Sequence, residues 1–233
     1  MTPSDRPPQA DLFESVNAAH DLRGVPDLKL QLEPGAWVLR AFALDAAPAL
    51  LDAINRVAQT AALRHMTTAR GLRMSVAMTN CGAAGWLSDG RGYRYAAKDP
   101  LTDQPWPAMP QVFSDLAERA ASAAGFDQFA PDACLINRYE PGARLSLHQD
   151  RDEADFDAPI VSVSLGVPAT FLWGGPSRVV RPRRISLQHG DVVVWGGPAR
   201  LSFHGIEPLR LGHHALTGNA RFNLTFRRAL ARS

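Results

Sequence analysis

Residues 221–227 read RFNLTFR, a run in which polar and apolar side chains alternate with a period of two. This period is typical of a β-strand, because successive side chains of a strand point to opposite faces of the sheet. The apolar row is Phe222, Leu224 and Phe226, and the polar row is Arg221, Asn223, Thr225 and Arg227. We expect the apolar row to pack into a core and the polar row to line the opposite face.

Seven more short runs between residues 134 and 204 are β-branched or alternating. They read CLINRY (134–139), ARLSLH (143–148), IVSVSL (160–165), ATFLW (169–173), RISLQ (184–188), DVVVW (191–195) and RLSFH (200–204). Turn signals separate them, among them Pro141-Gly142, Gly174-Gly175 and His189-Gly190. Eight short strands of this kind predict a mainly β, α+β fold whose core is a double-sheet jelly roll, also called a double-stranded β-helix.

Two helices are expected to brace one face of this jelly roll. Helical apolar spacing covers residues 45–60 and recurs over 111–124, where Gly125 stops it. Residues 66–110 between them are rich in Gly, Trp, Tyr and Pro, which predicts hairpins and surface loops. We expect a loosely held arm over residues 1–30 and a single domain over 31–233, with the jelly-roll core at 131–228.

The composition is that of a soluble globular protein. The 233 residues are 45% hydrophobic and 21% charged, which excludes disordered, collagen-like and coiled-coil proteins. No apolar run is long enough to cross a bilayer and the first residues do not resemble a signal peptide, so we predict a cytoplasmic protein. Cys81 and Cys134 are expected to be reduced and packed.

Positive charge is concentrated in one segment. Residues 64–98 contain six basic side chains and a single acid, Asp89, although the whole chain has a net charge of only +2. This segment predicts a surface that attracts phosphates, and the alternative is an ordinary solvated face. The six basic residues are Arg64, Arg70, Arg73, Arg91, Arg94 and Lys98.

The tripeptide His148-Gln149-Asp150 lies at the end of one predicted strand, and His204 ends another. Residues two apart in an extended chain face the same side, so these three can meet at one metal ion. Two imidazoles and one carboxylate leave further positions open, as in non-haem Fe(II) oxygenases. A zinc hydrolase and chance packing are the alternatives.

Arg221 and Arg227 share a strand face that would point into the barrel. Buried guanidinium groups are costly unless an anion meets them, and a dicarboxylate could pair with both. Asn137 and Tyr139 are two residues apart on another predicted strand, so they face the same side and offer neutral donors to the same ligand. The alternative is a polar row exposed to solvent.

Several separate motifs resemble the AlkB family of Fe(II)- and 2-oxoglutarate-dependent dioxygenases over residues 34–228. These are MSVAMTNCG (74–82), PWPAMPQ (105–111), PDACLINRYEPGA (131–143), LSLHQDRDE (145–153), APIVSVSLG (158–166), HGDVVVWGG (189–197) and RFNLTFR (221–227). The N-terminal arm and PSRVVRPRR (176–184) are less typical of that family.

The resemblance implies a role for each site residue. His148, Asp150 and His204 would bind Fe(II), and a nucleotide-recognition lid over residues 66–110 would cover the site. The 2-oxoglutarate pocket would consist of Asn137, Arg138, Tyr139, Arg221, Asn223 and Arg227. The substrate site would consist of Met78, Trp86, Tyr93, Arg94, Tyr95, Asp152, Glu153 and Arg178, with Met78 in the lid.

The implied activity is oxidative demethylation of bases such as 1-methyladenine and 3-methylcytosine in single- or double-stranded alkylated DNA, and also in RNA. The reaction uses Fe(II), O2 and 2-oxoglutarate and releases formaldehyde, succinate and CO2, so it repairs the base directly. Such lesions are cationic, which suits the Trp86 indole and the Asp152 carboxylate. A monomer with no membrane partner is expected. The rival functions are an oxygenase acting on a protein side chain or small molecule, and a silent nucleic acid binding module.

Overall fold

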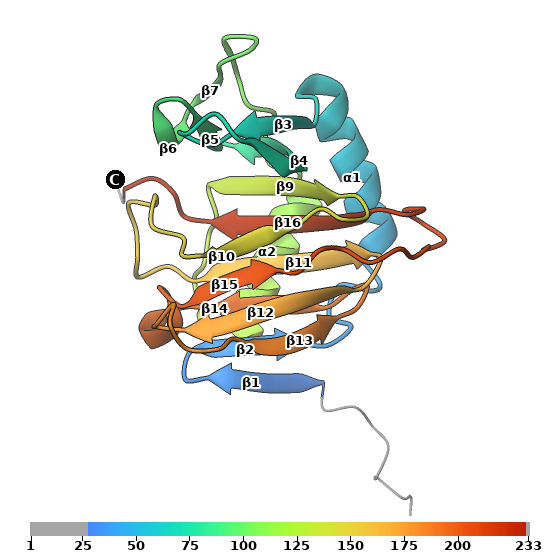
Figure 1. Cartoon of the computed structure of the whole chain (residues 1–233), viewed down its shortest axis with the longest axis vertical. Coiled ribbons are helices and arrows are strands. Elements are labelled where there is room, and N and C mark those ends of the chain that lie inside the picture. Colours follow the sequence, from blue (N-terminus) through green and yellow to red (C-terminus); the bar gives the residue numbers. More distant parts are fainter. Residues whose placement is uncertain (1–27, 232–233) are drawn as a thin grey trace, which may run out of the picture.

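The computed structural model describes residues 28–231, and its two larger β-sheets stack beside two helices (Figure 1). The helices are α1 (Ala47–Thr60) and α2 (Gln111–Ala123), and η1 (Gly197–Ala199) is a 3-10 turn. The strands are β1 (Lys29–Glu33), β2 (Ala36–Leu39), β3 (Arg64–Thr67), β4 (Arg73–Gly82), β5 (Gly85–Asp89), β6 (Gly92–Ala96), β7 (Lys98–Asp99), β8 (Gln104–Pro105), β9 (Ala133–Tyr139), β10 (Leu145–His148), β11 (Ile160–Gly166), β12 (Ala169–Gly175), β13 (Arg183–Leu187), β14 (Val192–Trp195), β15 (Phe203–Ile206) and β16 (Arg221–Arg227).

The two sheets form the jelly roll that the sequence predicts. The large sheet has the order β1-β2-β14-β11-β16-β9-β4-β3, and the small sheet has the order β10-β15-β12-β13. Every pairing within them is antiparallel, and neighbours such as β16 and β9 are distant in sequence. The predicted mainly β class, with two bracing helices, is therefore confirmed.

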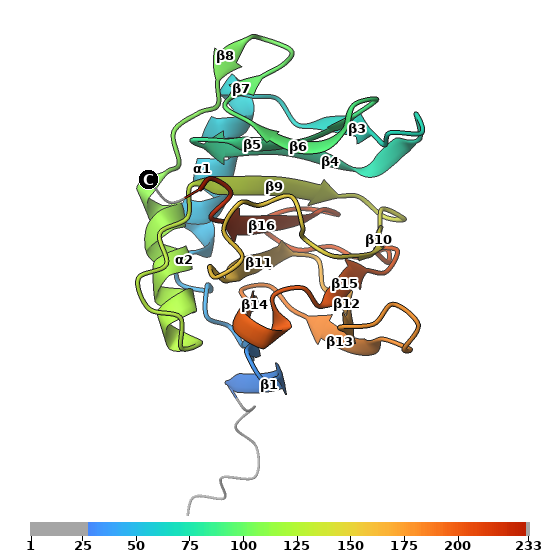
Figure 2. The same ribbon diagram turned by 90° about the vertical axis from the view of Figure 1, so that its left-hand side faces the viewer.

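The large sheet is covered on both faces, which explains why β11 and β14 are wholly buried. On one face α1 and α2 pack through residues such as Leu50 and Phe113 against Leu224 and Phe226 of β16. The opposite face meets the small sheet, and Figure 2 shows the helices and the small sheet on opposite sides of the large one. The apolar row of β16 therefore faces the helices, and its polar row faces the interior of the jelly roll.

The predicted strand at 200–204 was misplaced. The chain instead forms η1 and a turn, in which Ser202 N–H donates to the Ala199 carbonyl at 2.9 Å, and β15 begins only at Phe203. The cause is the buried Arg200 side chain, which donates to the Ala158 carbonyl at 3.1 Å and so holds the backbone in a turn. Strands β1 and β2 were not predicted.

The segment 66–110 contributes strand β4 to the large sheet and also forms two separate hairpins. Residues 73–82 form β4, which pairs with β9, whereas β5 and β6 form a separate hairpin and β7 and β8 another. The arm expected over residues 1–30 lies mostly outside the described residues, and Lys29 and Leu30 already belong to β1.

Two smaller expectations concern the cysteines and membranes. Cys81 and Cys134 are free and buried, as predicted, and they lie opposite each other on β4 and β9. No helix within residues 28–231 has the length and apolar character needed to span a membrane.

Candidate metal and co-substrate site

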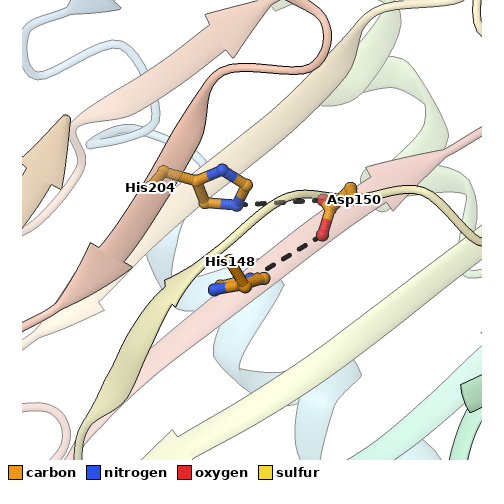
Figure 3. A group of neighbouring side chains, drawn as sticks. All are labelled: His148, Asp150 and His204. Atoms are coloured by element: carbon orange, nitrogen blue, oxygen red, sulfur yellow. Dashed lines mark ion pairs between the residues drawn. The ribbon is translucent and has the colours of Figure 1, made fainter. Parts of the chain in front are cut away.

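The structure brings His148, Asp150 and His204 together at one end of the small sheet (Figure 3). His148 ends β10 and is the register partner of His204 on β15, so the two rings lie with centroids 4.4 Å apart. Asp150 follows β10 and presents Oδ1 at 3.7 Å from His148 Nε2 and Oδ2 at 3.9 Å from His204 Nε2. One ligand atom from each residue lies within 4.8 Å of the others. The predicted set can therefore hold one ion.

Hydrogen bonds fix which ring nitrogen of each histidine faces this cluster. His148 Nδ1 lies 2.8 Å from the Ser146 carbonyl, and His204 Nδ1 lies 3.0 Å from the Ser202 carbonyl. A carbonyl only accepts, so Nδ1 carries a proton in each ring and Nε2 is the nitrogen that faces the cluster. Backbone acceptors of this kind orient the histidine ligands of metal ions.

The charge states also suit a cation. Burial, together with the neighbouring His148, lowers the pKa of His204 to about 4, so its ring is neutral at physiological pH. Burial alone would raise the pKa of Asp150, but Arg227 and the two histidines hold it well below its ordinary value. Neutral imidazoles and an ionised carboxylate are the forms that bind metal.

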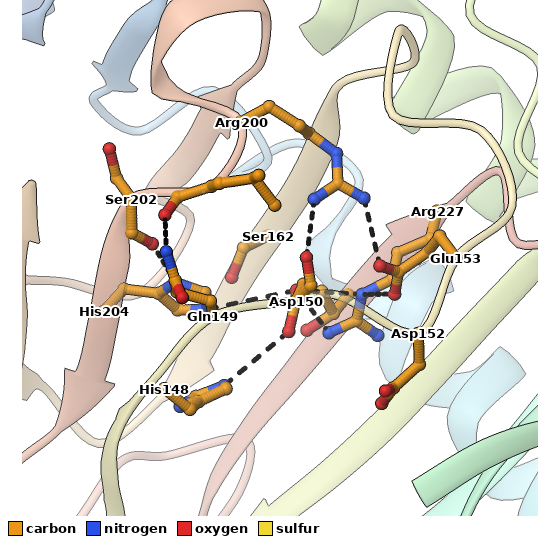
Figure 4. Close-up of polar contacts among 12 residues, drawn as sticks. His148, Gln149, Asp150, Asp152, Glu153, Ser162, Arg200, Ser202, His204 and Arg227 are labelled. Carbon is orange, nitrogen blue, oxygen red and sulfur yellow. Dashed lines mark hydrogen bonds and ion pairs between the residues drawn. The ribbon is translucent and has the colours of Figure 1, made fainter. Parts of the chain in front are cut away.

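Arg227 connects the large sheet to this cluster. Its Nε and Nη2 donate to Asp150 Oδ2, and its Nε lies 3.3 Å from Glu153 Oε1 (Figure 4). All three groups are buried. The guanidinium of Arg227, the last residue of β16, therefore lies directly beside the metal cluster.

Arg221, at the other end of the polar row, has unused donors. Its side chain is 1% exposed, its Nη2 donates to Ser164 Oγ at 2.9 Å, and its guanidinium lies 4.9 Å from the centre of the Tyr139 ring. Its Nε and Nη1 have no hydrogen-bond partner. A buried cation with two unpaired donors is an unfavourable arrangement that a carboxylate would relieve. The residues present therefore fit 2-oxoglutarate.

Neutral polar groups lie between the two arginines on the same face of β16 and β9. Asn137 Nδ2 donates to Asn223 Oδ1 at 3.1 Å, Asn137 Oδ1 has no partner, and Asn223 Nδ2 donates to Ser162 Oγ at 2.8 Å. Burial raises the pKa of Tyr139 to about 12, so its phenol stays protonated. The expected set of neutral donors is thus assembled.

Arg138 does not join this pocket. Strand alternation places it on the face of β9 opposite to Asn137 and Tyr139, where its side chain is 43% exposed and pairs with Glu140 at 3.1 Å. Only the family resemblance placed Arg138 in the pocket. The alternation of side chains along residues 135–139 already puts it on the face opposite to Asn137 and Tyr139.

Most residues expected at the substrate site connect the β5–β6 hairpin with the segment that follows Asp150. Trp86 and Tyr93 stack with centroids 5.4 Å apart, and Trp86 Nε1 donates to Asp152 Oδ2 at 2.9 Å. Tyr95 Oη donates to Glu153 Oε1 at 2.8 Å. Aromatic faces and two carboxylates therefore lie together beside the metal cluster.

The remaining three residues of that set do not take part in these contacts. Arg94 donates through both terminal nitrogens to the Asp89 carboxylate, at 2.8 and 2.7 Å. Met78 is buried within β4, and Arg178 is exposed in the turn between β12 and β13.

The positive surface expected over residues 64–98 is partly neutralised. Acids of the same layer pair with four of the six basic residues. Arg64 pairs with Asp99, Lys98 pairs with Asp103, and Arg91 and Arg94 both pair with Asp89. Within the described residues, Arg70 and Arg73 form no ion pair; Arg70 lies in the turn between β3 and β4, and Arg73 begins β4.

Sequence reasoning missed Arg200, which is only 3% exposed. Its Nη1 donates to the carbonyl of Asp150 at 3.0 Å, and its Nη2 donates to Glu153 Oε2 at 3.1 Å (Figure 4). It therefore supports both a metal-cluster residue and the acid that holds Tyr95. No local pattern signals this role, because the partners lie far away in sequence.

Comparisons with known proteins agree with this geometry. Residues 35–227 match the 2OG-Fe(II) oxygenase superfamily. The chain is 61% identical over 198 residues to the Alpha-ketoglutarate-dependent dioxygenase AlkB of Salmonella typhimurium, covering 85% of this chain and 92% of that protein. The protein of the same name from Escherichia coli is 59% identical over 198 residues, with the same coverage. The solved structure of OsALKBH1 superposes with a TM-score of 0.76 at 28% identity and covers 86% of this chain and 99% of that one.

Proposed function

Because the chain belongs to the AlkB family of the 2OG-Fe(II) oxygenase superfamily, we propose that it oxidatively demethylates alkylated nucleic acid bases. It is an Fe(II)- and 2-oxoglutarate-dependent dioxygenase. Its substrates are N-alkylated bases of the 1-methyladenine and 3-methylcytosine type in DNA and also in RNA. The products are formaldehyde, succinate, CO2 and the repaired base, so the damage is reversed without excision.

We assign His148, Asp150 and His204 as the iron ligands. The assignment rests on their convergence and on the protonation states that burial and neighbouring charges impose on His204 and Asp150. When bound, Fe(II) together with 2-oxoglutarate and O2 supplies the oxidising power for attack on the N-methyl group. The protein's own contribution is to hold these groups in place and to exclude water from them.

Within the co-substrate pocket, Arg221 receives the far carboxylate of 2-oxoglutarate and Arg227 lies at the end nearest the metal. The unpaired Nε and Nη1 of Arg221 support the first assignment, and the contact of Arg227 with Asp150 supports the second. Asn137, Tyr139 and Asn223 line the space between them.

The observation that carries the substrate assignment is the contact between the β5–β6 hairpin and the acids just after Asp150. Trp86 and Tyr93 offer flat π faces, and the Asp152 carboxylate offers negative charge, whereas Glu153 holds the Tyr95 hydroxyl. A methylated base that carries a positive charge gains from both, whereas an unmodified base gains much less. Since a duplex hides the methylated edge, the base must be unpaired or extruded before it can react.

We also propose that residues 31–233 act as one catalytic unit, a cytoplasmic monomer with its core at 131–228 and its lid at 66–110. The hairpins above the large sheet and the shared hydrogen bonds between lid and core support this organisation.

Mass spectrometry of an oligonucleotide with a single 1-methyladenine tests the function. Incubation with the protein, Fe(II), 2-oxoglutarate and ascorbate should remove the mass of one methylene group, and formaldehyde should appear in equal amount. His204→Ala should abolish the change, because one ligand is lost while the jelly roll is retained. Consumption of 2-oxoglutarate without any effect on alkylated DNA or RNA would instead favour a small-molecule or protein substrate.

A further inference from the structure

The turn between β12 and β13 has a composition that the function described so far does not explain. Residues 176–182 read PSRVVRP, and Val179 and Val180 are 95% and 61% exposed. Val179 is the most exposed of the large apolar side chains among residues 28–231. Two adjacent β-branched side chains at the end of a hairpin, held in water, mark this turn as a candidate contact surface.

The turn is held at its base and is free at its tip. Arg183 donates to the Leu32 carbonyl at 2.7 Å, and Arg184 pairs with Glu207 at 2.6 Å, so both are anchored to neighbouring segments. Arg178 and Arg181, which flank the two valines, are exposed, and neither forms an ion pair within the described part of the chain. Pro176 and Pro182 bracket the tip and restrict its backbone.

The hairpin also starts beside the metal cluster. On β12, Trp173 is the register partner of His204, and Gly175 is the partner of Phe203. β12 therefore ends only two residues after Trp173, the neighbour of the metal-cluster residue His204. Figure 2 shows the turn projecting from the small sheet.

A pair of apolar side chains between two guanidinium groups without ion pairs suits duplex nucleic acid as a partner. Stacked bases present apolar faces between two rows of phosphates, and proteins that open duplexes insert apolar side chains between base steps while cations hold the backbone. A protein partner would be expected to bury the valines without needing two unpaired arginines on either side.

We propose that this turn opens duplex nucleic acid next to the damaged base. Val179 and Val180 occupy the space that the extruded nucleotide leaves, and Arg178 and Arg181 contact the adjacent phosphates. The inference rests on the proposed demethylation and specifies that a duplex is among its substrates. Single strands need no opening, so the valines should matter little for them.

The experiment compares the wild-type protein with the V179S/V180S variant. The substrates are one 1-methyladenine oligonucleotide in single-stranded form and the same strand in a duplex. The kcat/KM of the variant should fall about tenfold on the duplex, because less of the unstacking cost is offset, and should stay within about twofold on the single strand. Leu211→Ser is the matched control, since Leu211 is 87% exposed and follows the end of β15 remote from His204.

The outcomes separate this inference from the proposed function. An unchanged duplex-to-single-strand ratio in V179S/V180S, or a wild-type protein that acts on single strands alone, would overturn the duplex-opening role and leave demethylation intact. If the wild-type protein demethylates neither substrate, both proposals fail together.

A second measurement does not depend on turnover. With Mn(II) in place of Fe(II), 2-aminopurine opposite the lesion should brighten when the wild-type protein binds the duplex, because its stacking is lost. V179S/V180S should reduce that rise severalfold, and an equal rise in both proteins would contradict the proposal.

Discussion

Arg227 donates two hydrogen bonds to the same atom of Asp150, Oδ2, from Nε at 2.9 Å and from Nη2 at 2.8 Å. This arrangement holds Oδ2 in place and leaves Oδ1 without a hydrogen bond from Arg227, at 3.7 Å from His148 Nε2. The large sheet therefore orients a ligand that belongs to the small one. Residues that orient ligands in this way commonly change metal affinity when they are replaced.

Arg227→Lys should accordingly weaken metal binding although the charge is kept. A lysine cannot supply the two-nitrogen contact, so we expect Mn(II) affinity, measured by calorimetry, to fall about 10- to 100-fold. Arg228→Lys is the control, because Arg228 follows it in sequence and contacts Asp155 at 3.8 Å instead. Equal Mn(II) affinity in Arg227→Lys and the wild type would show that the contact does not orient Asp150.

Arg221→Met should stabilise the protein while removing its response to co-substrate. Burial lowers the pKa of Arg221, and two of its donors are unpaired, so an apolar side chain should raise the free energy of unfolding by about 1 kcal/mol or more. With Mn(II) present, 2-oxoglutarate should raise the Tm of the wild type but not that of the variant. A variant less stable than the wild type would mean that Arg221 is already satisfied in the free protein.

Arg200→Gln should destabilise the protein because Glu153 loses a buried partner. Removing one member of such a pair costs about 3 kcal/mol or more, which urea unfolding can measure. Adding Glu153→Gln should recover part of the loss, since a buried carboxylate that has lost one of its two arginine partners is gone. Purely additive effects in this double-mutant cycle would indicate that the two side chains do not interact.

The triple variant R70Q/R73Q/R91Q should bind nucleic acid more weakly, with a smaller salt dependence. Because Arg91 already lies 3.5 Å from Asp89, we expect the slope of log affinity against log salt to fall by about two rather than three. Fluorescence anisotropy measures this, and 2-oxoglutarate turnover without nucleic acid should be unaffected. Arg56→Gln, on the exposed side of α1, is the control; unchanged affinity in the triple variant would rule out this binding surface.

His189 should make stability depend on pH. Its Nδ1 accepts the Gly166 N–H at 2.9 Å, and burial, together with the nearby His214, lowers its pKa below the ordinary 6.5. Since the folded-state pKa is the lower one, stability is lost as pH falls below about 6.5. His189→Asn, which keeps an acceptor but cannot protonate, should flatten the change in Tm between about pH 7 and pH 5. His213→Asn should keep the wild-type slope, and an equally steep slope in His189→Asn would assign the effect to another group.

Strand alternation accounts for most of what the sequence could predict. The period of two in RFNLTFR placed Arg221 and Arg227 on one buried face, and the two-residue spacing of His148 and Asp150 placed both beside His204. These inferences succeed because the direction of a side chain within a strand depends only on local geometry.

Features that depend on distant partners were less predictable. Arg200 lies in a buried turn and donates to the carbonyl of Asp150, fifty residues away in sequence. The predicted strand at 200–204 therefore began too early, because β15 begins at Phe203. Counting charges over residues 64–98 overestimated the positive surface, since Asp99 and Asp103 lie just outside that window and pair with Arg64 and Lys98. Charge pairing of this kind is set by tertiary structure rather than by composition.

The division of the site between the two sheets means that the oxidising activity depends on the two sheets staying packed together. The side chains assigned to iron lie at one end of the small sheet, whereas those assigned to 2-oxoglutarate lie on β9 and β16 of the large one. If the layers separate, no surface remains on which metal and co-substrate can meet. Partial unfolding should therefore extinguish oxidant production before the chain can damage itself or its neighbours.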